Sequence, residues 1–242
     1  MIGHRARRVA YFLLRRGHSR SAALIYILFC SWSLARVPRT LKFECCRLNS
    51  SKFLIIGPKI LAHEIPSLQG YSLCTVRTSL VSEFYIGNTW LFLSGIAAEE
   101  QKKHAQNLQT FSQVVYRRRT DCERCNANFF YNGTADCDEQ YLAVNRILCF
   151  LIAKGLASPN IKFLGMDFYV NGINKAPQNV MDPLNQDIMS LFEEHDIFKN
   201  FIHFKYFISC LRIDLSGNDD LWWVEKTSLI GFAKKISSAW NM

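Results

Sequence analysis

Short apolar segments that end in glycine alternate with helix-like segments along most of this chain. Lys52 to Ile56 is followed by Gly57, and Ile161 to Leu164 is followed by Gly165. Between these two segments, Glu139 to Leu156 carries apolar residues at helical spacing. Strands that alternate with helices build a sheet that is largely parallel. The sequence therefore predicts an α/β fold with a Rossmann-like, mostly parallel sheet flanked by helices.

Further segments fit this pattern. Strands are predicted at Tyr71 to Val76, Trp90 to Leu93 and Ser112 to Arg117, and Phe204 to Leu211 is rich in β-forming residues. Helices are predicted at Asp187 to His195, with Asp187 as its cap, and at Ser228 to Trp240. The polar stretch from Asp121 to Asp138 is predicted to be a long loop. Gly155 is predicted to end the helix that begins at Glu139.

The positive charge of the chain is concentrated at its beginning. The net charge is +9, and residues 1–50 hold ten Lys/Arg and one Glu, which accounts for all of it. The remaining residues, 51–242, have a net charge of zero. This balance argues against a nucleic-acid-binding surface on the body of the protein. We therefore expect two parts, a basic and apolar arm at 1–51 and a globular domain at 52–242.

The arm contains an uncharged run, Ala22 to Leu34, with arginines on both sides. The run is shorter than the roughly 20 residues that a spanning helix needs. It is consistent with a short signal anchor, a secretory signal, or a basic amphipathic helix on an anionic surface. The alternative is an extra helix packed on the body. Flanking positive charge favours membrane association, either peripheral or through a single span.

The cysteines do not form a regular disulfide pattern. Their number, nine, is odd, and Cys149 and Cys210 lie in apolar runs typical of buried thiols. Three others, Cys122, Cys125 and Cys137, have zinc-ligand character, but the nearest histidine, His104, is eighteen residues before Cys122. We therefore predict no metal site. The tryptophans near the C-terminus, Trp222, Trp223 and Trp240, are expected in core packing or in an interfacial patch.

The segment from Ile161 to Gly172 says most about function. Its strand is followed by Gly165, then by a carboxylate, a ring and a phenol at Asp167, Phe168 and Tyr169. In open α/β sheets, ligands bind outside the carboxyl ends of the strands. Gly57 ends the first strand in a similar way, where a phosphate usually approaches. These strand ends are the expected ligand site.

The order of these motifs resembles the bacterial sialyltransferases of glycosyltransferase family 42, over roughly residues 52–200. The resemblance rests on the strand ending in Gly57-Pro58, the long helix ending at Gly155, and Gly165-x-Asp167-Phe168-Tyr169. It implies a nucleotide-binding domain with a small lid. It also implies inverting transfer of sialic acid, or a related keto sugar, from a CMP-linked donor to a surface oligosaccharide. No metal or other cofactor is needed in that family.

The resemblance also suggests roles for single residues. Those expected to bind substrate are Gly57, Pro58, Lys59, Arg77, Gly165, Asp167, Phe168 and Asn171. Tyr169 and Lys175 are expected to stabilise the departing phosphate. Where the family places a catalytic histidine, this chain has Asp182, which we expect to deprotonate the acceptor hydroxyl. His195 and His203 lie farther along the chain and could replace Asp182 only if the fold brought them back.

Several family positions are altered here, including the polar residues that usually flank Gly57-Pro58. The alternative function is therefore a catalytically inactive homologue that binds a nucleotide or glycan in surface-polysaccharide assembly. In either case the expected partners are a nucleotide sugar, an oligosaccharide and a membrane surface, and no nucleic acid.

Overall fold

The computed structural model describes eleven helices and strands within the 242 residues. The described residues are 2–34, 51–57, 70–75, 87–93, 111–116, 129–130, 141–153, 155–168, 170, 192–193, 195–218 and 220–240. Among these residues, no helix is both long and apolar enough to cross a membrane.

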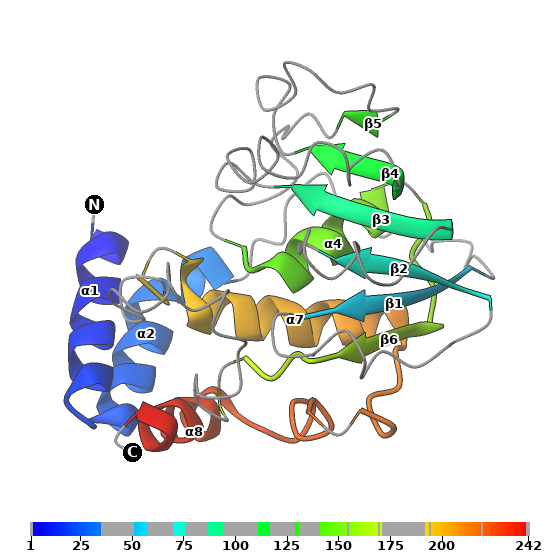
Figure 1. Ribbon diagram of the computed structural model, residues 1–242. Coiled ribbons are helices and arrows are strands. Elements are labelled where there is room, and N and C mark those ends of the chain that lie inside the picture. The colour runs from blue at the N-terminus through cyan, green and yellow to red at the C-terminus, as the bar shows by residue number, and fades with distance from the viewer. Residues whose placement is uncertain are drawn as a thin grey trace.

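The centre of the molecule is a parallel six-stranded sheet (Figure 1). Its strands are β1 (Lys52–Ile56), β2 (Tyr71–Thr75), β3 (Gly87–Leu93), β4 (Phe111–Tyr116), β5 (Phe129–Phe130) and β6 (Ile161–Leu164). They lie in the order β5-β4-β3-β2-β1-β6, and every described pairing is parallel. The predicted α/β fold with a mostly parallel sheet flanked by helices is confirmed.

Strand β1 lies between β2 and β6 and is buried after its first residue. Phe53 is in register with Ser72 of β2 and with Ile161 of β6. Phe53 to Ile56 are all buried, as expected for a central strand of a parallel sheet covered on both faces. The continuous apolar run that predicted this strand is therefore a consequence of its central position.

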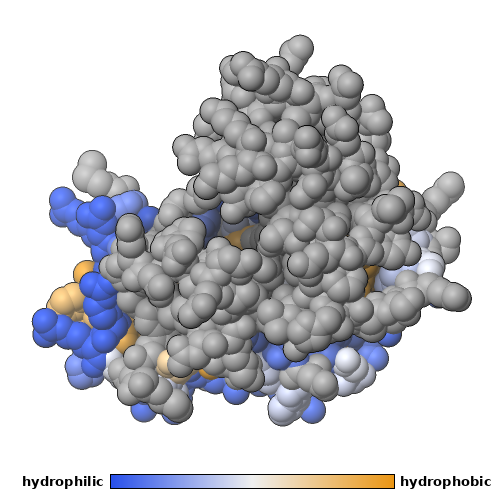
Figure 2. Space-filling view, viewed as in Figure 1, coloured by the Kyte–Doolittle hydropathy of each residue, from blue (hydrophilic) through white to orange (hydrophobic). Residues whose placement is uncertain are grey.

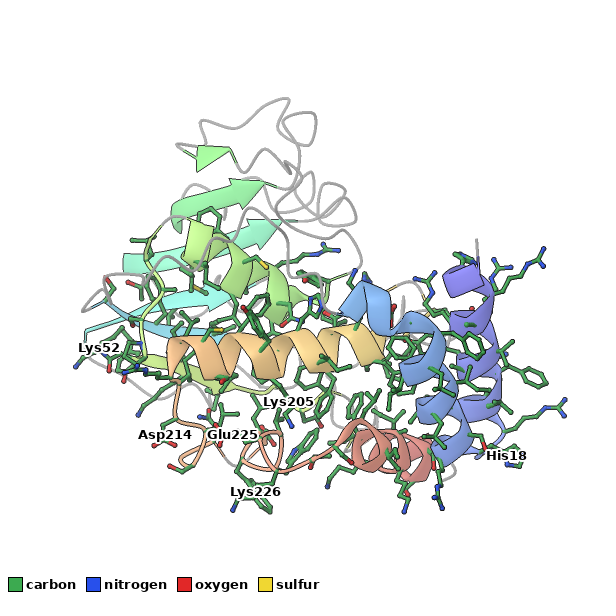
Figure 3. All side chains as sticks on the ribbon, turned by 180° about the vertical axis from the view of Figure 1, so that it is seen from behind. His18, Lys52, Lys205, Asp214, Glu225 and Lys226 are labelled. Carbon is green, nitrogen blue, oxygen red and sulfur yellow. The ribbon has the colours of Figure 1, made fainter. Side chains whose placement is uncertain are left out.

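Two helices, α4 (Ala143–Ala153) and α7 (Ile197–Leu211), lie against one face of the sheet (Figure 3). The Phe163 ring of β6 packs edge-on against the Phe204 ring of α7, with ring centroids 5.3 Å apart. Helix α4 ends as predicted before Gly155, which has a φ of 65° and donates its backbone N–H to Ile152. Glycine adopts this left-handed conformation without a steric penalty.

Helices α1 (Ile2–Arg15) and α2 (Ser19–Leu34) form a hairpin that packs against α7 and against α8 (Leu229–Trp240) (Figure 1). The buried face of the hairpin includes Tyr11, Leu14, Ala22 and Tyr26, and these side chains belong to the same hydrophobic core as the sheet. The alternative of helices packed on the body therefore describes residues 2–34. The remainder of the predicted arm, up to residue 50, lies outside the described residues.

The core beneath α8 is aromatic. Phe201 of α7 and Phe232 of α8 stack with centroids 4.2 Å apart, and Trp223 stacks on both rings. Trp223 is therefore a core residue, whereas Trp222 is 55% exposed. Lys205 of α7 holds the segment that precedes α8, because its Nζ donates to the backbone carbonyls of Glu225 and Thr227, both at 2.9 Å (Figure 3).

Three predictions about local structure were wrong. Phe204 to Leu211 is helical, because it continues a helix whose apolar residues Phe201, Phe204 and Ile208 recur at helical spacing and are buried. The predicted loop from Asp121 to Asp138 contains β5, whose two residues are too few for a periodic signal. Cys210 is exposed, because it lies on the side of α7 turned away from the core, whereas Cys149 is buried as predicted.

Candidate functional site

The order in which strands are added to the sheet reverses at β1. Strands β2 to β5 extend to one side of β1, and β6 then returns to its other side. In open parallel sheets this reversal leaves a crevice at the carboxyl ends of the two strands, where ligands bind. The strand arrowheads in Figure 1 point toward α1, α2 and the first turn of α7. The candidate site therefore lies between β1, β6 and these helices.

At the carboxyl ends of β1 and β6 the backbones of Gly57 and Gly165 are in close contact. The N–H of Gly57 donates to the carbonyl of Leu164 at 2.7 Å, extending the sheet past the end of β1. A Cβ atom built on Gly57 would lie 2.3 Å from the carbonyl oxygen of Gly165 and 2.5 Å from Cγ of Met166. Only glycine fits at position 57, and its role among the described residues is to let the two strand ends meet.

The chain turns sharply after β6. Gly165 has a φ of 66° and Phe168 a φ of 52°, and the backbone N–H of Val170 donates to the carbonyl of Asp167 at 3.2 Å. A left-handed conformation is unfavourable for a residue such as phenylalanine, and such strain is concentrated at functional sites. The turn therefore changes the direction of the chain directly after β6.

The two side chains in this turn have different environments from those expected for ligand contacts. Phe168 is buried, and its ring packs edge-on against Phe201, Phe204 and Phe232. Its ring therefore anchors the turn to the aromatic core. Asp167, three residues after the end of β6, is 3% exposed, so its carboxyl group is buried at this end of the sheet.

A second polar cluster joins the N-terminal hairpin to α7. The hydroxyl groups of Tyr11 and Tyr26 donate to Oδ1 of Asp196 at 3.0 and 2.8 Å, and Nη1 of Arg7 lies 3.8 Å from Oδ2. Asp196 is also the N-cap of α7 and accepts from the backbone N–H of Lys199 at 3.3 Å. Its side chain thus connects three helices at one point.

Burial dominates the electrostatics of this cluster. It raises the pKa of the Asp196 carboxyl, and the hydrogen bonds from Tyr26, Lys199 and Tyr11 oppose that shift. Burial also raises the pKa of both tyrosines, with the Asp196 charge as the second cause. Lys199 lies in the first turn of α7. Burial lowers its pKa to about 8, and the charge of Arg7 acts in the same direction.

Helices α4 and α7 are joined near their first turns by a buried polar network. The backbone N–H of Leu142 donates to Oδ1 of Asn200 at 2.7 Å, and Nδ2 of Asn145 donates to the same oxygen at 2.9 Å. The Tyr141 hydroxyl and Nδ1 of His203 are hydrogen-bond partners. His203 is completely buried in this network, so its ring stabilises the helix pair and has no access to an acceptor hydroxyl.

The structure brings together Gly57, Gly165, Asp167 and Phe168 from the predicted set of site residues. Pro58, Lys59, Arg77, Tyr169, Asn171, Lys175 and Asp182 lie outside the described residues. The cysteines considered as zinc ligands and His104 also lie outside them. Within the described ranges, no group of three or more His, Cys, Asp or Glu side chains is arranged to hold a metal ion.

Sequence reasoning missed the residues that join the helices around the crevice, namely Tyr11, Tyr26, Tyr141, Asp196 and Lys199. One local signal was present, because Asp196 precedes an apolar run in the manner of a helix cap. The long-range pairings carry no local signal, since Tyr11 and Asp196 are 185 positions apart.

The described residues bring two cationic side chains to the junction of the hairpin with α7: Arg7 lies beside Asp196, and Lys199 is on the first turn of α7. Comparisons of the chain with models of protein families, with curated proteins and with solved structures find no match.

Proposed function

We propose that this chain is a glycosyltransferase similar to the family 42 sialyltransferases, and that it binds a CMP-linked sugar at the carboxyl ends of β1 and β6. The observation that carries the proposal is the reversal of strand order at β1, where Gly57 and Gly165 meet. A crevice of this kind is the usual position for a nucleotide in open α/β sheets. The Gly165 to Tyr169 motif begins at that point.

The proposed reaction is an inverting displacement at the anomeric carbon of the donor sugar. The acceptor hydroxyl oxygen forms a bond to that carbon, and the bond to the CMP phosphate oxygen breaks with both electrons going to the phosphate. Asp182 takes the hydroxyl proton as general base. Tyr169 donates a hydrogen bond to the departing phosphate, and the ammonium group of Lys175 balances its negative charge.

The described residues contribute by positioning. The left-handed turn at Gly165 and Phe168 sets where the chain leaves the sheet, one residue before Tyr169. The Phe168 ring holds that turn against α7 and α8 through its contacts with Phe204 and Phe232. A site organised in this way needs no metal to orient the phosphate, because side chains and helix termini can supply the positive potential.

Incubation of the full chain with CMP-sialic acid and an oligosaccharide acceptor tests the proposal. CMP release and a sialylated product are expected for the wild type. Tyr169→Phe, which removes one donor to the departing phosphate, should lower kcat by about 100-fold. Tyr206→Phe, at an exposed position on α7, is the matched control and should keep wild-type turnover.

The outcomes separate the two functions. Unchanged turnover in Tyr169→Phe would discard the role of that hydroxyl. CMP binding without donor hydrolysis or transfer would instead favour the inactive homologue that binds a nucleotide or glycan.

A further inference from the structure

The outer surface of the α1–α2 hairpin combines exposed apolar and exposed basic side chains. Arg5, Val9 and Phe12 on α1, and Arg16 directly after its last residue, follow one another at i, i+4, i+7 and i+11 and are exposed. This spacing places them on one stripe of the helix, opposite the buried Ala10, Tyr11 and Leu14. The stripe therefore faces away from the core.

Helix α2 has the same organisation. Arg20, Leu24, Ile27 and Leu28 lie at i, i+4, i+7 and i+8 and are exposed, whereas Ala22, Ala23 and Tyr26 are buried. Leu28 is 70% exposed and Phe12 is 51% exposed, so these are large apolar side chains in water. Figure 2 shows hydrophobic surface between strongly hydrophilic side chains at the edge of the molecule where α1 lies.

The charge on this surface has one sign. Residues 2–34 contain no Asp or Glu, and the exposed charged side chains of the hairpin are Arg5, Arg8, Arg15, Arg16 and Arg20. Apolar side chains flanked by arginines match the boundary between the acyl chains and the phosphates of an anionic lipid layer. A nucleic acid would be a poorer match, because it offers no apolar surface for Val9, Phe12 and Leu28.

We propose that the outer surface of the α1–α2 hairpin docks the protein on an anionic lipid bilayer, with both helices lying in the plane of the membrane. The inner faces of both helices are already engaged, because Tyr11 and Tyr26 donate to Asp196 of the body. The hairpin therefore binds lipid with its remaining side while staying attached to α7. This orientation holds the first turn of α7, which Asp196 caps, near the lipid surface.

Co-sedimentation with vesicles tests this proposal on the full chain. The wild type should bind phosphatidylcholine vesicles that contain phosphatidylglycerol and should bind pure phosphatidylcholine weakly. Each arginine near an anionic surface contributes about a fivefold change in partitioning, so R5Q/R20Q should bind roughly 25-fold more weakly. Phe12→Ser with Leu28→Ser removes apolar area that would enter the lipid and should weaken binding at least about tenfold.

Matched controls lie elsewhere on the surface. Lys52→Gln with Lys226→Gln removes two exposed cations, which Figure 3 shows away from His18 in the turn between α1 and α2. Tyr206→Ser removes an exposed ring from α7. Both controls should bind like the wild type. All the replaced side chains are exposed, so the thermal transitions of the variants should match that of the wild type, which checks that folding is unchanged.

Three results would overturn the proposal. The first is equal binding to neutral and anionic vesicles, and the second is wild-type binding by the apolar or the arginine double variant. In the third, the protein does not bind vesicles, and sedimentation velocity shows a dimer that the Phe12→Ser replacement dissociates. That third result would show that a second copy of the chain covers this surface.

Discussion

The hydroxyl group of Tyr26 donates to Oδ1 of Asp196 at 2.8 Å and so connects α2 with the first turn of α7 across 170 positions of sequence. Tyr11 donates to the same oxygen from α1. The carboxylate therefore caps one helix and attaches two others. Because these helices lie beyond the carboxyl ends of the strands, Asp196 also determines what stands over the candidate site.

Replacing Asp196 should destabilise the protein strongly. Asp196→Ala removes the helix cap and leaves two buried hydroxyl groups without their acceptor, so we expect a loss of about 3 kcal/mol in the free energy of unfolding. Tyr26→Phe removes one hydrogen bond and should cost about 1 kcal/mol. Chemical denaturation measures both values.

The control for this pair is Asp214→Ala. Asp214 is exposed and accepts hydrogen bonds from the backbone N–H and the hydroxyl of Ser216, two residues further along the chain. Its replacement should cost less than half as much as that of Asp196. Equal losses in the two variants would mean that Asp196 does not hold the hairpin in place.

Glycine at position 57 should be essential to the end of β1. In Gly57→Ala the new methyl group would meet the Gly165 carbonyl and the Met166 side chain, so the strand ends must separate. Overpacking of this kind costs about 1–3 kcal/mol, which thermal or chemical unfolding would detect. Gly217→Ala is the control, because a Cβ built there would meet no described atom within 4 Å apart from its two chain neighbours. Similar stability of the two variants would contradict the close approach of β1 and β6.

The burial of Lys199 predicts a pH dependence of stability. Its pKa falls from 10.5 to about 8 in the folded protein, so between these values the unfolded chain binds more protons than the folded one. Stability contributed by this group therefore rises with pH across that window. The free energy of unfolding of the wild type, minus that of Lys199→Met, should increase from pH 7 to pH 9.5.

The exposed Lys226→Met serves as the reference for that comparison. Its difference from the wild type gives the effect of removing a lysine side chain from an exposed position. Taking differences between variants also removes the contributions of the cysteines and of Lys205. If the difference in free energy of unfolding between the wild type and Lys199→Met did not change with pH, the Lys199 ammonium group would be solvated in the folded protein.

The parts of the fold that sequence predicted are those with local signals. Five of the six strands were predicted because apolar runs such as Lys52 to Ile56 reflect a strand buried on both faces. Helix α4 carried a wide apolar stripe and a stop signal at Gly155. Strand β5 has two residues and takes its identity from pairing with Val115 and Tyr116, which no local pattern shows.

Helix α7 shows why local preference can mislead. Its second half contains Phe204, Tyr206, Phe207 and Ile208, residue types that favour strands, yet the segment is helical from Ile197 to Leu211. The Asp196 cap at its start and the packing of Phe201 and Phe204 on Phe232 and Phe168 outweigh that preference. Tertiary contacts of this kind decide the structure when propensities are weak.

The candidate site was predicted in part. The sequence located the strand ends at Gly57 and Gly165, because glycine after an apolar run marks a close backbone approach. It suggested a ligand role for the Phe168 ring, which the structure places in the aromatic core instead. The distinction between a ring that meets a ligand and one that anchors a turn depends on α7 and α8, which are distant in sequence.

Calorimetric titration of the full chain with CMP is the most direct test of a nucleotide site at the crevice between β1 and β6. The account predicts saturable binding at one site per chain, with AMP binding more weakly. It also predicts that Gly217→Ala binds like the wild type and that Gly57→Ala, where folded, binds CMP more weakly. The absence of a binding heat for CMP over a range of temperatures would contradict the proposed function.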